Sequence, residues 1–258
     1  MASVNKKFIF KSLYSLLLLS VLAGCGEQGA DGTVSGRDTG IGGSTARMAI
    51  VGDFLYAISG RDLQLFDISE PQTPNPWVKV DVSREIQTLF PHQDFLLIGA
   101  ADGVYIFDNS DQASPVQVGE FIHATAQDPV VAKDGYAYVT LKSDFTRPNG
   151  FIDDQLNVLD ISDVTNPVLV REQPMQAPEG LVIAGNKLFV CDGIAGLKQF
   201  DISNPEEPVI QDSLPMLDCN DLIAQNNILY VITDTSIQQY DYSVTPLAFI
   251  STLSEGAN

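Results

Sequence analysis

A short pattern recurs five times along this chain: an apolar or aromatic residue is followed by Asp, one further residue and Ser. The Asp residues of the pattern are Asp67, Asp108, Asp160, Asp201 and Asp241. Their spacings are 41, 52, 41 and 40 residues, so the second interval carries an insertion of 11. Each Asp follows two runs that are rich in β-branched and aromatic residues and that flank a turn, and each precedes a Pro and another apolar run. A period near 40 residues with about four short strands per unit is typical of a β-propeller.

We therefore expect an all-β fold, a single five-bladed β-propeller of four-stranded antiparallel blades over residues 46–258. No stretch of the chain beyond residue 24 has the apolar stripe and the caps of a helix. Each repeat supplies its own four strands, so the sequence predicts that packing between the first and last blades closes the ring.

The fourth repeat carries the pattern most clearly, as LVIAGNKLFVCDG at 181–193 followed by GLKQFDISNP at 196–205. These segments resemble the LVIVD-repeat family, which is known mainly from bacterial surface and secreted proteins. The resemblance covers residues 46–258 and weakens in the fifth repeat, where 234–237 lack the usual Gly-Leu. It implies a β-propeller, and the motif is architectural, so it implies no catalytic residue.

Asp followed by a small polar residue and then Pro is turn chemistry, because the carboxylate can accept hydrogen bonds from backbone N–H groups of the turn. We interpret the five repeated Asp residues as turn caps, since one copy occurs in every repeat. The alternative is a ring of metal sites.

The first 24 residues have the features of a secretory signal. Lys6, Lys7 and Lys11 precede an apolar run, SLYSLLLLSVL at 12–22, which is short for a membrane span. The tetrapeptide LAGC at 22–25 resembles the bacterial lipobox. That resemblance implies cleavage before Cys25, a diacylglycerol on its sulfur and an acyl chain such as palmitate on its amine. The alternative is an ordinary signal peptide with a chance Cys. Residue 26 is Gly rather than Asp, which favours the outer membrane over the inner one.

Residues 25–45 follow as the lipidated Cys and a Gly-rich tether, which we expect to be flexible. Beyond residue 24 the chain has 11 basic and 33 acidic residues, a net charge of −22. An anionic membrane surface repels such a body, so the acyl chains on Cys25 must provide the anchoring. The charge also excludes a sequence-independent nucleic-acid binder, which needs a basic surface.

The insertion lies in the third repeat, at residues 142–154, between the second and third strands. It breaks the repeat and is rich in aromatic and charged groups, so we predict that it contacts a partner on the face we call the top. The candidate partner-binding residues are Asp144, Phe145, Arg147, Phe151, Asp153 and Asp154. The alternative is a neutral difference in loop length.

Acidic residues also converge on the top face, at the starts of the first strands and in the loops after the second strands. Asp128, Glu179 and Asp221 are weak candidates for a Ca²⁺ site, since carboxylate oxygens are the ligands that Ca²⁺ prefers. The chain lacks an EF-hand-like spacing, and its two His residues lie on opposite faces of the predicted propeller. We therefore expect no metal and no cofactor.

No Ser/His/Asp or Cys/His arrangement survives this placement, so we expect no enzyme. The first hypothesis is a lipid-anchored binding or scaffold propeller that docks another envelope or surface protein. The alternatives are a carbohydrate or small-ligand binder and, further off, a glycoside hydrolase or lyase that uses top-face carboxylates.

Cys191 and Cys219 are an even pair in an oxidising compartment once Cys25 carries lipid. Both are expected on the top face, in neighbouring blades. A disulfide requires the loop 216–219 to fold over the end of the intervening strand. The alternative, two buried thiols, stays open at this point.

Overall fold

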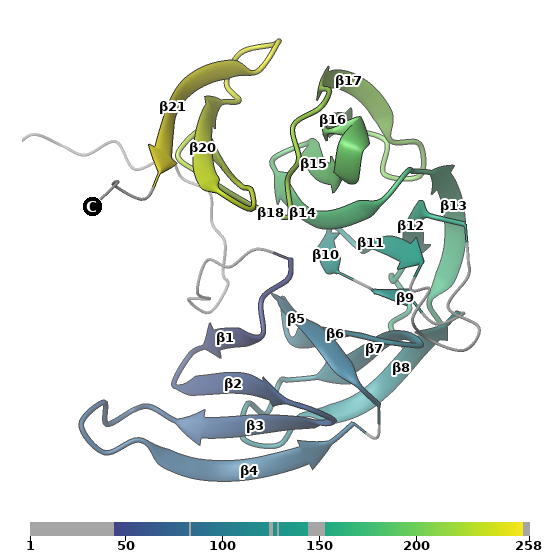
Figure 1. The fold of residues 1–258 in the computed structure, drawn as a ribbon. Helices are drawn as coiled ribbons and strands as arrows, with labels where there is room; N and C mark the ends of the chain where they lie inside the picture. The colour runs from purple at the N-terminus through teal and green to yellow at the C-terminus, as the bar shows by residue number, and fades with distance from the viewer. Residues whose placement is uncertain (1–43, 83, 124–125, 128, 144–152, 255–258) are drawn as a thin grey trace, which may run out of the picture. The chain divides into compact units, whose positions relative to one another are not determined.

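The computed structural model describes residues 44–82, 84–123, 126–127, 129–143 and 153–254, and these form a nearly all-β domain (Figure 1). They make five antiparallel sheets and one short 3₁₀ helix, η1 (Gly193–Ala195). Within these ranges no helix is long and apolar enough to cross a membrane. The signal, Cys25 and most of the tether lie outside the described residues.

Every sheet has the same order, with four strands that follow one another from the inside to the outside. We call the sheets blades 1 to 5. The innermost strands are β1 (Met48–Val51), β5 (Ile86–His92), β10 (Val130–Lys133), β14 (Pro178–Ala184) and β18 (Asp221–Gln225). The second strands are β2 (Phe54–Ser59), β6 (Phe95–Ala100), β11 (Tyr136–Ser143), β15 (Lys187–Asp192) and β19 (Ile228–Ile232). The third strands are β3 (Asp62–Asp67), β7 (Gly103–Asp108), β12 (Gln155–Asp160), β16 (Leu197–Asp201) and β20 (Ser236–Asp241). The outermost strands are β4 (Asn75–Asp81), β8 (Val116–Ile122), β13 (Val168–Pro174), β17 (Val209–Leu214) and β21 (Ala248–Ser254).

This arrangement confirms the five four-stranded blades of a propeller. Blade 3 has one additional strand, β9 (Ala126–Gln127), which pairs with the end of β11. The register between the third and fourth strands shifts once in every blade, one or two residues before the repeated Asp. A bulge of this kind increases the local twist, and its recurrence makes it part of the repeat.

The repeated Asp residues are turn caps, as predicted. In every blade the Asp carboxylate accepts a hydrogen bond from the N–H of the Ser two residues later, at 2.8–2.9 Å. Hydrogen bonds from the hydroxyl and the N–H of that Ser lower the pKa of each Asp. The carboxylates are exposed and fix the turn that leads to the outermost strand.

The core is divided into four apolar clusters, one between each pair of consecutive blades. Blades 2, 3 and 4 are therefore buried on both faces, and strands β6, β7, β11 and β12 are almost continuously buried. Such strands read as unbroken apolar runs rather than as alternating ones.

Blades 1 and 5 differ, because burial alternates along β1, β3 and β19. No apolar cluster among the described residues joins blade 5 to blade 1. Figure 1 shows β1–β4 and β18–β21 on the two sides of this break. Closure by packing of the first blade on the last is thus not found, since each of these two blades buries only the face that its one neighbour covers.

The segment just before β1 contacts three other blades. Ser44 is buried, and its Oγ accepts a hydrogen bond of 2.7 Å from the N–H of Leu181 in blade 4. Thr45 donates to Asp221 at the start of blade 5, and the carbonyl of Ala46 accepts from the N–H of Leu89 in blade 2. Residues 44–46 therefore link the inner strands of blades 2, 4 and 5.

Candidate functional site on the top face

The top face is the one where the second strands end and the third strands begin. The acidic residues in these turns each have a partner within the chain. Their contacts are Asp62 with Lys79 at 2.7 Å, Asp102 with Arg84 at 2.9 Å, Asp234 with Asn220 at 2.7 Å, and Asp192 with Lys198. Because each carboxylate is paired inside or beside its own blade, these acids are not gathered into one binding site.

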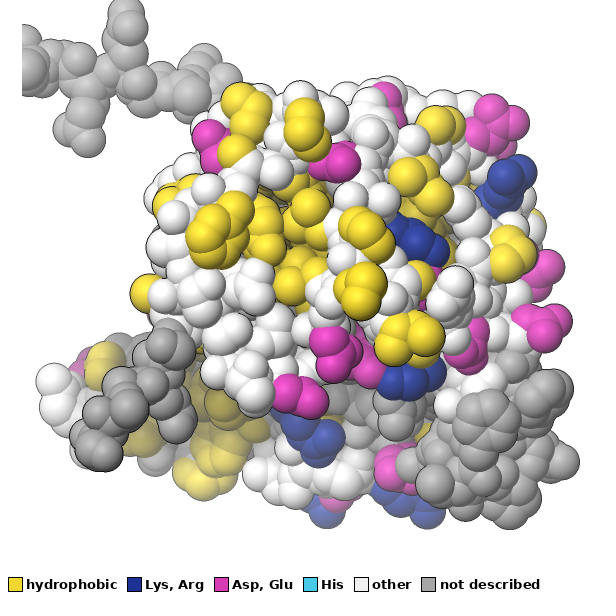
Figure 2. Space-filling model, turned by 45° about the horizontal axis from the view of Figure 1, so that its top comes forward, with side chains coloured by type: hydrophobic (Ala, Val, Ile, Leu, Met, Phe, Trp, Pro, Cys, Tyr) yellow, Lys and Arg dark blue, Asp and Glu magenta, His cyan; other side chains and the backbone are white. Residues whose placement is uncertain are grey.

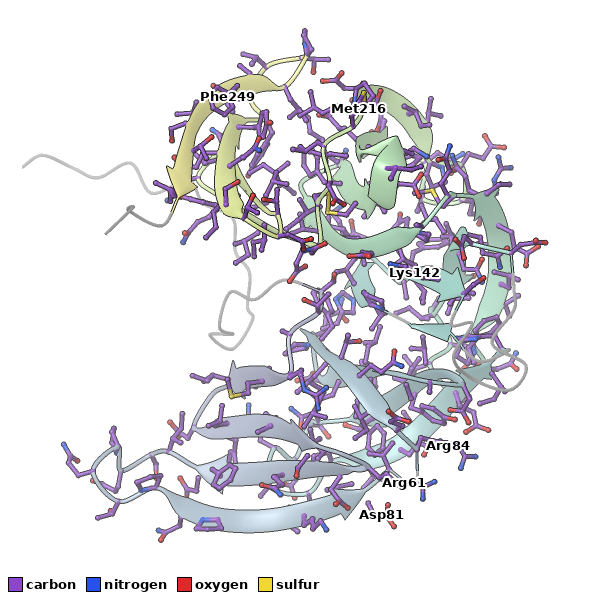
Figure 3. The ribbon with its side chains drawn as sticks, viewed as in Figure 1. Arg61, Asp81, Arg84, Lys142, Met216 and Phe249 are labelled. Carbon is purple, nitrogen blue, oxygen red and sulfur yellow. A yellow bond between two sulfur atoms is a disulfide. The ribbon has the colours of Figure 1, made fainter. Side chains whose placement is uncertain are left out.

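At the top of blade 2, Arg84, Tyr105 and Asp102 form a small cluster. Arg84, labelled in Figure 3, donates to the Tyr105 hydroxyl at 2.9 Å, and that hydroxyl donates to Asp102 at 3.0 Å. Burial, together with the hydrogen bond to Asp102, raises the pKa of Tyr105 to about 12, although Arg84 opposes this shift. The tyrosine is therefore a neutral hydrogen-bonding group at neutral pH.

Two of the three calcium candidates line one cavity of about 220 Å³ near the inner strands. Glu179 is held there by the ammonium of Lys142, and Asp221 accepts a hydrogen bond of 2.5 Å from Thr45. Burial raises the pKa of Asp221 despite that hydrogen bond. Asp128, the third candidate, lies outside the described residues. In the part of the chain that the structure describes, no three acidic, His or Cys residues are placed to hold a metal ion.

Asp192 organises the top of blade 4. Its side chain is fully buried, forms an ion pair with Lys198, and accepts hydrogen bonds from the N–H groups of Gln176 and Ala177 at 2.7 and 3.0 Å. A buried carboxylate with this many donors is well compensated. It fixes the connection from β13 to β14 against the end of β15.

A disulfide joins Cys191 and Cys219, with their Cα atoms 5.4 Å apart, so the bridge that the sequence left open is present. Cys191 lies at the end of β15, and Cys219 lies in the loop that leads to β18. The disulfide therefore ties the loop between blades 4 and 5 to the top of blade 4. The sequence could not decide this, because the path of that loop determines whether the two Cys residues meet.

Two large apolar side chains protrude from the surface beside this disulfide. Met216, labelled in Figure 3, is 89% exposed, and Ile194 in η1 is 81% exposed. Their loops touch, because a Cβ at Gly196 would lie 2.0 Å from the carbonyl oxygen of Leu214. The backbone of Met216 has a φ of 62°, which is costly for a residue with a side chain. Figure 2 shows hydrophobic side chains gathered on the side of blades 4 and 5.

The ends of the insertion lie next to the connection from β13 to β14, which Asp192 holds. β11 ends at Ser143, whose N–H donates to the Asp154 carboxylate at 2.7 Å, and the carbonyl of Asp154 accepts from the N–H of Met175. The insertion thus connects the second and third strands of blade 3 on the top face, as predicted. Asp153 is exposed and Asp154 half-buried. The remaining candidates, Asp144, Phe145, Arg147 and Phe151, lie outside the described residues.

The repeat pattern did not single out Ile194 and Met216 as exposed side chains. A signal for Ile194 was available, since it stands between Gly193 and Gly196, where the pattern after the second strand otherwise has a turn. The roles of the cations Lys142 and Lys198 were not predicted either, because their partners are known only once the strands are paired.

Three solved structures with a similar fold are longer than this chain. A functionally unknown protein from Desulfotomaculum acetoxidans aligns with a TM-score of 0.65 and 12% identity, over 85% of this chain and 70% of that one. Citrobacter koseri AztD aligns with a TM-score of 0.58 and 14% identity, over 80% of this chain and 60% of that one. The computationally designed Ika8 protein aligns with a TM-score of 0.57 and 13% identity, over 80% of this chain and 60% of that one. The chain thus spans 60–70% of the length of these structures, and the likeness shows the fold alone.

No curated protein is similar to the chain in sequence. The LVIVD repeat family matches residues 42–82, 150–172 and 179–214, which fall in blades 1, 3 and 4. The matched segments include the blade in which the sequence pattern is clearest and the strands that end in Asp67, Asp160 and Asp201. The chain thus carries LVIVD repeats in three of its five described blades.

Proposed function

We propose that this chain is a lipid-anchored binding or scaffold module of the bacterial cell envelope, held by Cys25 at the outer membrane, which docks a protein partner on its top face. The observation that carries the proposal is the exposed pair Ile194 and Met216 above blade 4. Exposed side chains of this size beside rigid backbone are typical anchors of protein interfaces.

Three features support this surface as a preorganised one. The disulfide holds the loop of Met216, Asp192 holds the neighbouring connection, and the insertion of blade 3 begins and ends beside it. Preorganised loops lose little conformational entropy on binding. A residue held at positive φ is a further mark of a functional position, because the surrounding structure must maintain its strain.

We also propose that the chain is not an enzyme and that its top-face acids have structural roles. Glu179 and Asp221 share a cavity, but Lys142 and Thr45 already engage their carboxylates. A hydrolase that used this pair would need both carboxylates available to the substrate.

Affinity capture from the native envelope tests the docking surface. The bait is the lipidated protein, compared with the double variant Ile194→Glu/Met216→Glu. The control is Val168→Glu/Val209→Glu, which adds the same charge to exposed positions on the outermost strands. We expect a stoichiometric partner with the wild type and with the control, and at least a tenfold loss with the first variant.

Equal recovery with both variants would place the contact elsewhere and contradict the assignment of this surface. Failure of the wild type to retain any partner would contradict a binding module altogether.

A further inference from the structure

The free faces of blades 1 and 5 each carry rows of mainly apolar residues that pair across their strands. On blade 1 the rows are Met48–Ala57–Gln64–Lys79 and Ile50–Leu55–Phe66–Pro76. On blade 5 they are Ile223–Tyr230–Gln239–Ser251 and Asp221–Ile232–Ile237–Leu253. Directly opposite residues lie on the same side of a sheet, so each row forms part of one surface.

The second- and third-strand positions of these rows are buried in the neighbouring blade. Met48 is 65% exposed, whereas its counterpart Leu89 in blade 2 is 1% exposed. Tyr230 and Ile232 are half-buried, whereas their counterparts Phe189 and Cys191 in blade 4 are fully buried. A shallow hollow on blade 1 is lined by side chains that include Phe66 and Pro76. Contiguous exposed apolar surface of this kind marks an interaction site.

The chemistry of the missing neighbour follows from the repeat. The free face of blade 5 is equivalent to the face with which blade 4 packs on blade 5, through Phe189 and Cys191. The free face of blade 1 is equivalent to the face with which blade 2 packs on blade 1, through Leu89 and Ile98. The surface that fits both is therefore a four-stranded antiparallel sheet that is apolar on both faces, as blades 2, 3 and 4 are.

The lengths of the structural neighbours indicate how many further blades a complete ring would hold. The chain accounts for 60–70% of each of them. If every unit has about 40 residues, the remainder corresponds to about two or three further blades. We propose that further LVIVD-type blades pack between the free faces of blades 5 and 1 and complete the ring.

Site-specific photo-crosslinking in the cells that make the protein tests this proposal. A benzophenone amino acid is placed at Ala57 on the free face of blade 1 or at Tyr230 on the free face of blade 5. Matched controls carry it at Val116 and Val168, on the outermost strands of blades 2 and 3. We expect both free-face positions to cross-link to peptides of further repeat units with the Asp-x-Ser step, and the controls to give at least tenfold less.

Met48→Glu and Ile237→Glu should lower these yields at least tenfold, because a carboxylate on either face disfavours the packing of an apolar blade. Cross-links between two copies of this chain, cross-links to a polypeptide without such repeats, or no product above the controls would each overturn the proposal.

Discussion

The repeated Asp shows how a single side chain defines a repeat. It lies at the end of the third strand and accepts the N–H of the Ser two residues later. The same geometry occurs in all five blades, although the residue between Asp and Ser is Ile, Asn or Tyr. The constraint is therefore on the two hydrogen-bonding residues and not on the residue between them.

Asp201→Ala should lower the melting temperature, whereas Asp201→Asn should retain most of it, because the amide oxygen still accepts the N–H of Ser203. The folded pKa of Asp201 is lowered from 3.8, so its stabilisation is complete above that value and is lost as the pH falls through the folded pKa. Thermal denaturation at neutral and strongly acidic pH checks this. Equal losses of melting temperature in the two variants would contradict the cap. A difference between the wild type and Asp201→Ala that stays the same at both pH values would also contradict it.

Asp192 provides a second test at the residue level, because its carboxylate is buried and forms the ion pair with Lys198. Asp192→Ala leaves that ammonium and the N–H groups of Gln176 and Ala177 without their acceptor. Removing one member of a buried pair costs about 3–5 kcal/mol. Urea denaturation measures the loss, which should be smaller in Asp192→Asn. A loss below that of an average exposed substitution would show that the cluster is dispensable.

At the level of elements, the disulfide and the bulges hold strands whose pairing alone would not fix them. The bulge before each Asp turns the outermost strand, and the disulfide fixes the connection from blade 4 to blade 5. The bulges act within each blade, and the disulfide acts between two blades.

The double variant Cys191→Ala/Cys219→Ala should be less stable by about 3 kcal/mol, which corresponds to a melting temperature ~6–12 °C lower for a domain of this size. The expected cause is the released loop between β17 and β18. Calorimetry gives the shift, and limited proteolysis should show new cleavage near Met216. If the variant and the wild type have the same melting temperature, the disulfide contributes nothing to stability.

At the scale of the whole molecule, strong negative charge bears on the proposed lipid anchor. The chain beyond residue 24 carries a net charge of −22, so we expect it not to adhere to anionic lipid by itself. Membrane attachment then depends on the acyl chains proposed at Cys25.

Cys25→Ser should therefore move the protein from the detergent phase to the aqueous phase in a temperature-induced phase separation. The matched control is Cys219→Ser, which removes a different Cys and should leave partitioning unchanged. Continued recovery of Cys25→Ser in the detergent phase would refute lipid anchoring at this residue.

The sequence predicted what is local and missed what depends on neighbours in space. The strands followed from the β-branched and aromatic runs and the caps from Asp-x-Ser, and both patterns act within a few residues. The open break did not, because Met48 and Leu55 are as apolar as their buried counterparts Leu89 and Leu96. Composition cannot distinguish a face that is covered from one that is not. The pair Lys142 and Glu179 is 37 residues apart in the chain and required the blades to be placed first.

The contacts of residues 44–46 also have a mechanical consequence. A pull on the chain from its N-terminal side reaches Ser44 before it reaches β1. Ser44, Thr45 and Ala46 pass that load to Leu181, Asp221 and Leu89, which belong to three different blades. The force is thus shared by the inner strands and loads their hydrogen bonds together, instead of peeling β1 from the edge of the first sheet one bond at a time.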